Sequence, residues 1–501
     1  MGQPDGRRRL PAVDTILGQS LLSDALRDRG RVAVRAAVRT VLDELRSEWR
    51  EGAAVDASPE GVARRALKVL DRERRNLRPV INATGILLHT GLGRAPLAAE
   101  AIEAIREVAA GYCNLEFDLS DGDRGRRASA VAGLLGELTG AEAATVVNNN
   151  AGATVLALRA LAAGREVIVS RGQLVEIGGS FRLPEIFEVS GARLREVGTT
   201  NRTRLSDYRL SIGPETAAIL RVHPSNYRIV GFSESPELAE LVQLAHAHGL
   251  WAIDDIGSGA LAPGCPPGEH DEPTAAAGIT DGADLVLFSG DKLLGGPQCG
   301  IMVGRREAIG RIEVDPLMRA LRVDKLTLTA LEATLRLARD PALAADRVPL
   351  WSMIAAPASE LHARAEALAE TVRSELGLAA RAVASEAYVG GGSLPVRAIA
   401  SAAVAVGRPF PIRGREESEA AFAEALRLGD PPVVARVADG AVLLDLRSVR
   451  RDEEPRLLDA MRAVCQDMMV PATTRRDGRG STSDEGPTRA DLRSGGRKAR
   501  A

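Results

Sequence analysis

The chain has 501 residues, of which 45% are apolar and 26% charged, so it can bury a sizeable core and form two or three domains. Its 65 basic and 67 acidic residues leave a formal charge of −2, which excludes a global field directed at a nucleic acid or a membrane. The basic start lacks the apolar run of a secretory signal, and no apolar run reaches the ~18 residues that span a bilayer, so we expect a soluble, cytoplasmic protein.

Lysine and cysteine are both scarce. Few amines are therefore available for Schiff-base chemistry. The only lysines are Lys68, Lys292, Lys325 and Lys498. The cysteines lie far apart, without the paired spacing of a zinc site, a redox motif or a disulfide framework, so we expect reduced, buried thiols and no metal site. They are Cys113, Cys265, Cys299 and Cys465.

Residues 1–78 are predicted to form a separate helical domain with a linker. One helical stripe is apolar and is flanked by arginines. The stripe consists of Val34, Val38, Val41, Leu42, Leu45 and Trp49, and the arginines are Arg31, Arg35, Arg39, Arg46 and Arg50. The segment carries 17 Lys and Arg against 12 Asp and Glu, a surplus of five. On charge alone, a solvated helix face is the favoured interpretation.

Residues 79–345 alternate short apolar strands with helical stretches. This pattern is typical of an α/β domain with a mainly parallel central sheet and helices on both faces. The expected strands are 143–147, 166–170, 217–222, 250–254, 283–288 and 300–304. Ligands of open α/β sheets bind at the carboxyl ends of the strands, so the turns that follow these strands are the candidate sites of chemistry.

Two of these turns are suited to ligand binding but are weak signals alone. VVNNNAGATVLALRALA at 146–162 begins a helix, and the backbone N–H groups of Asn150, Ala151 and Gly152 suit a phosphate. Many α/β helices begin with Asn and Gly for structural reasons. In HPSN at 223–226, Asn226 could contact a cofactor oxygen, whereas His223 is better interpreted as a packed or orienting side chain.

The next two turns carry charge. LWAIDDIGSG at 250–259 ends in Asp254 and Asp255, one of which could keep a pyridine nitrogen protonated, although a cap or turn role is the plainer interpretation of each alone. FSGDKLLGGPQCG at 288–300 places Lys292 in a glycine-rich turn that could fix its approach to an aldehyde, and Ser289 could bind a phosphate. An isolated lysine there would be an ordinary loop cation.

The rest of the chain is predicted to form a small domain and a tail. Residues 346–471 show a helix at 361–376 and strands at 431–437 and 441–449, as in a small α+β domain. Residues 472–501 are rich in Gly, Ser and Arg, with almost no apolar side chains, so we expect disorder.

The strand ends that carry Asn, Asp and Lys, in this order, resemble those of fold-type I pyridoxal-phosphate enzymes. Motifs spread over about residues 10–470 further resemble bacterial selenocysteine synthases, the seryl-tRNA(Sec) selenium transferases. The most specific are NATGILLHTGLGR at 82–94 and GDKLLGGPQ at 290–298. The others include EVGTTNRT, HPSNYRIVGF and LMRALRVDKLTLTALEATL.

The resemblance implies roles for individual residues. Lys292 would hold pyridoxal 5'-phosphate as a Schiff base, and Asp255, rather than Asp254, would face the pyridine nitrogen. Asp291 would handle protons at the substrate. Two arginines, Arg94 and Arg319, would hold the anionic selenium donor, for which a guanidinium is a rigid bidentate partner.

The resemblance also implies the reaction and its partners. The seryl hydroxyl of seryl-tRNA(Sec) would be replaced by selenium from selenophosphate, residues 1–78 would bind the tRNA, and the protein would be a homo-oligomer, a homodecamer in the family. Two alternatives remain. A related pyridoxal-phosphate lyase acting on a small amino acid or amino sugar would have little use for a basic N-terminal domain. A catalytically inert tRNA-binding protein would not need Lys292, Asp255 or Asn226.

Overall fold

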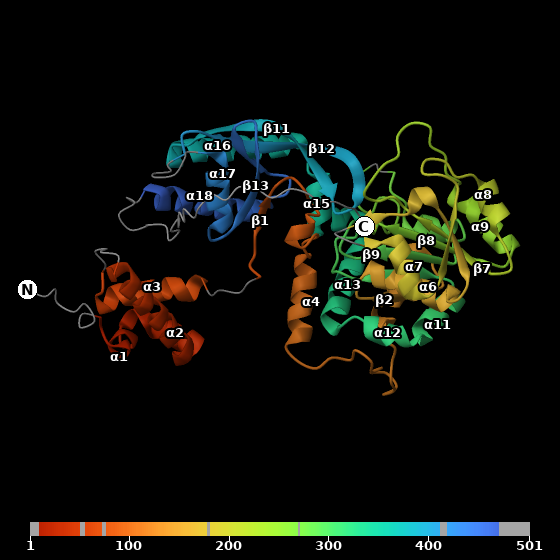
Figure 1. The fold of residues 1–501 in the computed structure, drawn as a ribbon, viewed down its shortest axis with the longest axis horizontal. Helices are drawn as coiled ribbons and strands as arrows, with labels where there is room; N and C mark the ends of the chain where they lie inside the picture. The colour runs from red at the N-terminus through yellow and green to blue at the C-terminus, as the bar shows by residue number, and fades with distance from the viewer. Residues whose placement is uncertain are drawn as a thin grey trace, which may run out of the picture. The chain divides into compact units, whose positions relative to one another are not determined.

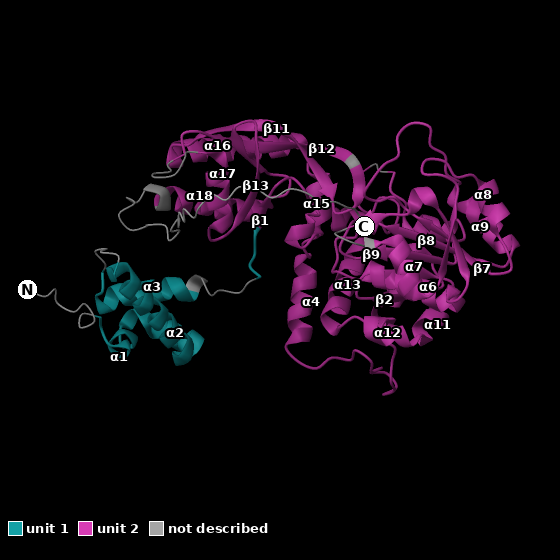
Figure 2. Ribbon diagram, in the orientation of Figure 1, with its two compact units in different colours: residues 1–80 teal, residues 81–501 magenta. Residues whose placement is uncertain are grey.

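The computed structural model describes residues 10–50, 56–72, 77–177, 181–268, 271–410 and 418–469. The chain divides into two compact units, residues 1–80 and residues 81–501 (Figure 2). The segment that we expect to be disordered, residues 472–501, lies outside the described residues. Within the described ranges, no helix is both long and apolar enough to cross a membrane.

The first unit is built from helices around the predicted apolar stripe. Its elements are α1 (Val13–Leu17), η2 (Ser20–Leu22), α2 (Ser23–Arg50) and α3 (Pro59–Arg72). Five of the six stripe residues are buried in its core, whereas Trp49 is half-buried. The chain adopts a left-handed φ of 78° at Gly30, which glycine tolerates without steric cost, and this interrupts α2.

The larger unit contains a seven-stranded sheet with the order β2-β10-β9-β8-β7-β3-β6. Figure 1 labels β2, β7, β8 and β9 of this sheet. Its strands are β2 (Ala143–Val147), β3 (Glu166–Ser170), β6 (Arg193–Val197), β7 (Thr216–Val222), β8 (Trp251–Gly257), β9 (Leu285–Ser289) and β10 (Gly300–Gly304). All are parallel from β9 to β6, and β10 is antiparallel to both of its neighbours. All six predicted strands are present, and the predicted fold class is confirmed.

Helices cover both faces of this sheet because its central strands are apolar on both sides. In β9, Leu285 and Leu287 pack with α6, α7 and α11, whereas Val286 and Phe288 pack with α5, α9, α10 and α13. The helices are α4 (Ala99–Ala109), α5 (Ser129–Thr139), α6 (Asn150–Ala162), α7 (Leu183–Ser190), α8 (Leu205–Ser211), α9 (Leu238–Ala247), α10 (Ala275–Thr280), α11 (Arg306–Val314), α12 (Pro316–Leu321), α13 (Lys325–Ala338), α14 (Pro341–Arg347) and α15 (Pro349–Ala355).

A second sheet, with the order β1-β13-β14-β12-β11, has its own core. Its strands are β1 (Ile81–Ala83), β11 (Ala379–Gly390), β12 (Ser393–Gly407), β13 (Val433–Ala438) and β14 (Ala441–Asp445), and its helices are α16 (Ala358–Leu376), α17 (Glu419–Leu428) and α18 (Glu454–Met469). The first strand pairs parallel with β13, so a segment from the start of this unit completes a sheet formed mostly by its end. A short pair, β4 (Glu176–Ile177) and β5 (Phe181–Arg182), stands apart.

The four cysteines are free thiols. Cys265, Cys299 and Cys465 are buried as expected, but Cys113 is exposed, so our expectation of buried thiols is wrong at that position. Among the described residues, no group of three or more His, Cys, Asp and Glu side chains is placed to hold a metal ion.

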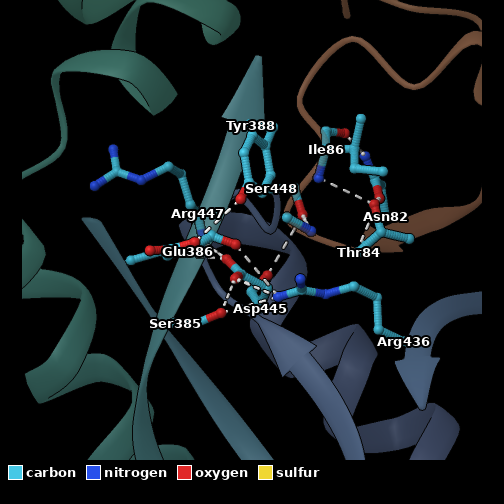
Figure 3. A network of polar contacts seen from close by, with 12 residues as sticks. Asn82, Thr84, Ile86, Ser385, Glu386, Tyr388, Arg436, Asp445, Arg447 and Ser448 are labelled. Atoms are coloured by element: carbon cyan, nitrogen blue, oxygen red, sulfur yellow. Dashed lines mark hydrogen bonds and ion pairs between the residues drawn. The ribbon is translucent and has the colours of Figure 1, made fainter. Parts of the chain in front are cut away.

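Asp445, at the end of β14, is a fully buried carboxylate at the centre of a polar network (Figure 3). Its oxygens accept hydrogen bonds from the hydroxyls of Ser385 and Ser401, both at 2.7 Å, and from the guanidinium of Arg436 at 3.2 Å. The backbone N–H of Arg447 donates to it at 3.1 Å. Neighbouring strands thus satisfy a charge that would otherwise be costly to bury.

The same network holds the segment that follows β1. The N–H of Gly85 donates to Ser448 at 2.9 Å, and a Cβ on Gly85 would lie 2.8 Å from Cγ of Asp445. The next residues extend along β11, where the N–H groups of Leu87 and Leu88 donate to the carbonyls of Tyr388 and Val389. The segment that leads to Arg94 is therefore fixed against the second sheet.

We expect the Asp445→Ala variant to lose about 3–5 kcal/mol of unfolding free energy, because it leaves buried hydroxyls and the Arg436 guanidinium without their acceptor. Chemical denaturation monitored by circular dichroism measures this loss. The control Asp452→Ala removes a carboxylate that is largely exposed and pairs with Arg450, so it should change stability by less than about 1 kcal/mol. Equal effects of the two variants would contradict the role given to Asp445.

Candidate active site

Lys292 lies in the glycine-rich turn after β9, at the carboxyl edge of the main sheet. Its side chain is buried, with 5% exposed. Two glycines without side chains border the amine. A Cβ atom placed on Gly257 would lie 4.0 Å from Nζ, and one placed on Gly392 would lie 3.8 Å from it, so these positions leave space beside the amine. Burial, and then the positive charge of Arg94, hold the pKa of Lys292 below its ordinary value of 10.5. A larger share of the amine is therefore neutral and nucleophilic.

Asp254 and Asp255 point to opposite faces because they are consecutive in β8. The guanidinium of Arg221 binds Asp254 through two hydrogen bonds of 2.7 Å, which satisfies that carboxylate away from the lysine. Asp255 lies on the side of Lys292, since its Oδ1 and the lysine Nζ are both within 4.0 Å of the Cβ position on Gly257. The structure thus brings Asp255, and not Asp254, together with the lysine.

Asp255 is held by the first turn of α6. Its Oδ1 accepts from Nδ2 of Asn150 and its Oδ2 accepts from Oγ1 of Thr154, both at 2.9 Å. Burial raises the pKa of Asp255, while these two hydrogen bonds and the charge of Lys292 oppose the rise. The other amide atom of Asn150, Oδ1, is buried without a hydrogen-bond partner among the described residues, which leaves a polar atom for a ligand.

The start of α6 retains part of the predicted phosphate site. Asn149 caps the helix by accepting from the N–H of Gly152 at 2.8 Å, so that donor is already bonded. A phosphate at this helix start would meet the N–H groups of Asn150 and Ala151 first. The side chain of Asn150 itself serves Asp255.

Two other predicted cofactor contacts occupy different surroundings. Ser289 ends β9 as a buried residue three positions before Lys292. Asn226 is exposed, and its Nδ2 donates to the carbonyl of Glu176 at 2.8 Å. Its Cβ lies 3.7 Å from the Cβ position on Gly392, which also adjoins Lys292. Asn226 therefore borders the lysine site, although its amide is bonded to the backbone.

Arg94 and Asp291 form an ion pair of 2.8 Å next to Lys292. Arg94 adopts a left-handed φ of 63°, which is uncommon for a residue other than glycine and is typical of functional sites. The other predicted arginine, Arg319, is exposed on α12. Within the part of the chain that the structure describes, no ion pair or hydrogen bond joins the side chain of Arg319 to this group, so the structure brings only Arg94 to the lysine.

Three groups beside the lysine were not among the predicted site residues. The turn between β11 and β12 contains Gly390, Gly391 and Gly392, all with left-handed φ, and brings the second sheet against Lys292. Ser225 is buried, with Oγ 3.5 Å from the Cβ position on Gly392. Glu272 accepts from the N–H of Leu394 at 2.6 Å and so fixes the end of the turn. Three consecutive glycines were a visible signal of a close backbone approach.

A cavity of ≈1260 Å³ adjoins this group at the carboxyl ends of β3 and β7. His223 and Pro224 line it on one side and Leu394 on another. Each wall is continuous in sequence with a residue near Lys292. Ser225 follows Pro224, and Gly392, whose Cβ position lies 3.8 Å from Nζ of Lys292, precedes Leu394 by two positions. The cavity therefore borders the surroundings of the lysine.

The comparisons with known proteins agree over nearly the whole chain. The family model described as L-seryl-tRNA selenium transferase matches residues 80–450, and the model of the selenocysteine synthase N terminus matches residues 7–46. The L-seryl-tRNA(Sec) selenium transferase of Moorella thermoacetica is 49% identical over 457 residues, which cover 91% of this chain and 96% of the relative. The enzyme of the same name from Desulfomicrobium baculatum is 49% identical over 463 residues, which cover 91% of this chain and 98% of the relative.

A solved structure shares the fold. D-glucosaminate-6-phosphate ammonia-lyase superposes with a TM-score of 0.53 over 78% of this chain and 97% of that protein, at 21% identity. At this level of identity, the likeness concerns the fold alone.

We expect the rate at which the apoprotein covalently captures pyridoxal phosphate to rise with pH through a midpoint below 10.5, because only the neutral amine of Lys292 attacks the aldehyde. Arg94→Ala removes a positive charge that lowers the pKa of Lys292, so the midpoint should move to higher pH. Stopped-flow absorbance across the pH range measures this shift. The control Arg319→Ala should leave the midpoint in place, and an unmoved midpoint in Arg94→Ala would contradict the electrostatic role.

Proposed function

The chain belongs to the L-seryl-tRNA selenium transferase family, and from this premise we propose how its residues divide the work of the reaction. The protein is an enzyme that converts seryl-tRNA(Sec) to selenocysteinyl-tRNA(Sec). The seryl hydroxyl leaves with a proton as water, and selenium from selenophosphate forms a bond to the β-carbon. Water cleaves the Se–P bond of the donor, and inorganic phosphate is released. The observation that carries the assignment is the family match over residues 80–450, with a buried lysine at the sheet edge of the matched region.

The family implies pyridoxal phosphate, and the residues present fit it. The buried amine of Lys292 and the carboxylate of Asp255 lie on the same side of the sheet edge. Asn150, at the start of α6, has an amide oxygen without a hydrogen-bond partner among the described residues. Lys292 would hold the aldehyde carbon, Asp255 would face the pyridine nitrogen, and Ser289 with the start of α6 would bind the phosphate. Asn226 would contact the ring oxygen. When bound, the cofactor supplies an electron sink for the charge left at the seryl α-carbon.

Two side chains would move the protons. The neutral amine of Lys292 would accept the proton of the seryl α-carbon, and its lowered pKa enlarges the share of the amine that is neutral. Asp291, held by Arg94, handles the proton that leaves with the hydroxyl. Both groups are nearly excluded from solvent, which strengthens their electrostatic interactions.

The selenium donor would bind to arginines. Arg94 offers a guanidinium beside Lys292, and we assign Arg319 to the same donor, although it lies on the exposed side of α12.

We propose that the protein works in the cytoplasm as a homo-oligomer, namely the homodecamer that the family resemblance implies. Large apolar side chains exposed at Tyr112, Phe117 and Leu119 support association of copies.

The alternative functions are less well supported. The lyase alternative has a neighbour of the same fold, but at 21% identity, against 49% for the transferases. An inert tRNA-binding protein would not need a buried lysine with a carboxylate on the same side.

The N-terminal unit is our candidate for tRNA binding. Of the five flanking arginines, Arg31 pairs with Asp14 and Arg46 pairs with Asp43. Arg35 and Arg39 are exposed and form no ion pair within the described residues, so their charges are available to phosphates.

Purified protein supplied with pyridoxal phosphate, seryl-tRNA(Sec) and selenophosphate should form selenocysteinyl-tRNA(Sec), measured by transfer of radiolabelled selenium. Lys292→Ala should abolish this transfer and the covalent trapping of cofactor by borohydride. Lys325→Ala is the control, because Lys325 donates to the carbonyls of Val108 and Gly111 and has a structural role. Trapping that survives in Lys292→Ala and is lost in Lys325→Ala would refute the assignment.

The double variant Arg35→Glu/Arg39→Glu should bind seryl-tRNA(Sec) more weakly, and its affinity should depend less steeply on salt, by about one unit of log–log slope for each phosphate that the variant no longer binds. Gel-shift titrations at several salt concentrations measure both quantities. Arg31→Glu/Arg46→Glu alters the same charge at arginines that are already paired and should weaken binding less. Equal effects of the two double variants would mean that net charge, rather than a defined binding surface, accounts for the affinity.

A further inference from the structure

We propose that the cavity beside Lys292 receives the 3′-terminal adenosine of the aminoacyl-tRNA, an inference that rests on the proposed function. The reason is one of reach. In a seryl ester, only two carbon atoms separate the amino nitrogen from the ribose oxygen. A seryl group at Lys292 therefore brings its ribose to the immediate surroundings of the amine, where the walls at 223–225 and 392–394 lead directly into the cavity.

The cavity is large enough for a ligand bigger than serine. Pockets for drug-sized molecules usually measure about 300–1,000 Å³, and this one measures ≈1260 Å³. A nucleoside with the adjoining sugar-phosphate chain fills such a volume, whereas a free amino acid does not.

The lining is suited to a ribose and a base. Hydroxyl and amide side chains recognise the 2′-hydroxyl and the base edges of unpaired RNA. They are contributed by Gln173, Thr200, Asn201, Thr203, Ser233 and Ser235. Nε2 of His223 and Oε2 of Glu272 lie 3.2 Å apart, so these two side chains pair with each other in the wall of the cavity, and Glu272 is only 7% exposed.

The charges of the lining suit the phosphates of the preceding nucleotides. Arg228 and Arg397 are exposed and form no ion pair in the described ranges, so both guanidinium groups are available. Three acidic residues also line the cavity. Glu234 is paired with Arg202 at 2.9 Å and Glu272 with His223 at 3.2 Å, whereas Asp271 is exposed. Guanidinium groups bind phosphate oxygens in a bidentate manner, which favours a nucleotide chain over a neutral ligand.

The test uses two uncleavable probes with the cofactor-loaded enzyme, a cytidylyl-cytidylyl-adenosine that carries serine as a 3′-amide and the corresponding adenosine 3′-serylamide without phosphates. Calorimetric titration should show that Arg228→Ala and Arg397→Ala each weaken trinucleotide binding about tenfold and leave the nucleoside nearly unaffected. Ser235→Trp, which fills the cavity from an exposed position, should weaken both probes. The control Arg209→Ala removes an exposed arginine outside the cavity and should change neither.

Selenium transfer to seryl-tRNA(Sec) by the unaltered protein is measured in parallel. If transfer occurs and the cavity variants bind both probes as tightly as the unaltered protein, the adenosine site is refuted and the proposed function stands. If the unaltered protein transfers no selenium to seryl-tRNA(Sec), the proposed function fails, and the inference fails with it.

Discussion

The active site depends on the burial of an amine and a carboxylate on the same side of one sheet edge. Removing either charge from water costs several kcal/mol, and neither Lys292 nor Asp255 is exposed enough to recover it from solvent. The carboxylate is compensated by Asn150 and Thr154, whereas Arg94 pushes the amine toward its neutral form. Asp255 thus lacks a directly bonded cation, a deficit that a protonated pyridine nitrogen would fill.

Both sheets of the larger unit contribute to this arrangement. The main sheet supplies Lys292 and Asp255 from adjacent strands, β9 and β8. The second sheet supplies the glycine turn that carries Gly392 and, through the network of Asp445, the fixed path of the segment leading to Arg94. A buried carboxylate distant in sequence from the lysine therefore helps to position the residues around it.

Several elements were predictable from local pattern, and others were not. The strands at 143–147, 166–170 and 300–304 have the predicted bounds because each is a short apolar run closed by polar residues or glycine. β6 was not predicted, since its sequence RLREV is polar at the sheet edge. The alanine-rich β11 was also missed, because Val383 and Val389 are its only β-branched side chains. The run of three glycines was visible in the sequence, but its contact with Lys292 could be recognised only once β11 had been placed, because the two lie about 100 positions apart in sequence.

The residues alone did not decide between Asp254 and Asp255, since alternation fixes only that they face opposite ways. The neighbouring strand β7 decides which aspartate faces the lysine, because its Arg221 neutralises Asp254 and leaves Asp255 for the lysine. A similar dependence links the two stages of the proposed reaction. An anionic donor bound at Arg94 would offset the positive charge that lowers the pKa of Lys292. Donor binding would thus favour the protonated lysine after elimination, when the amine no longer needs to act as a base.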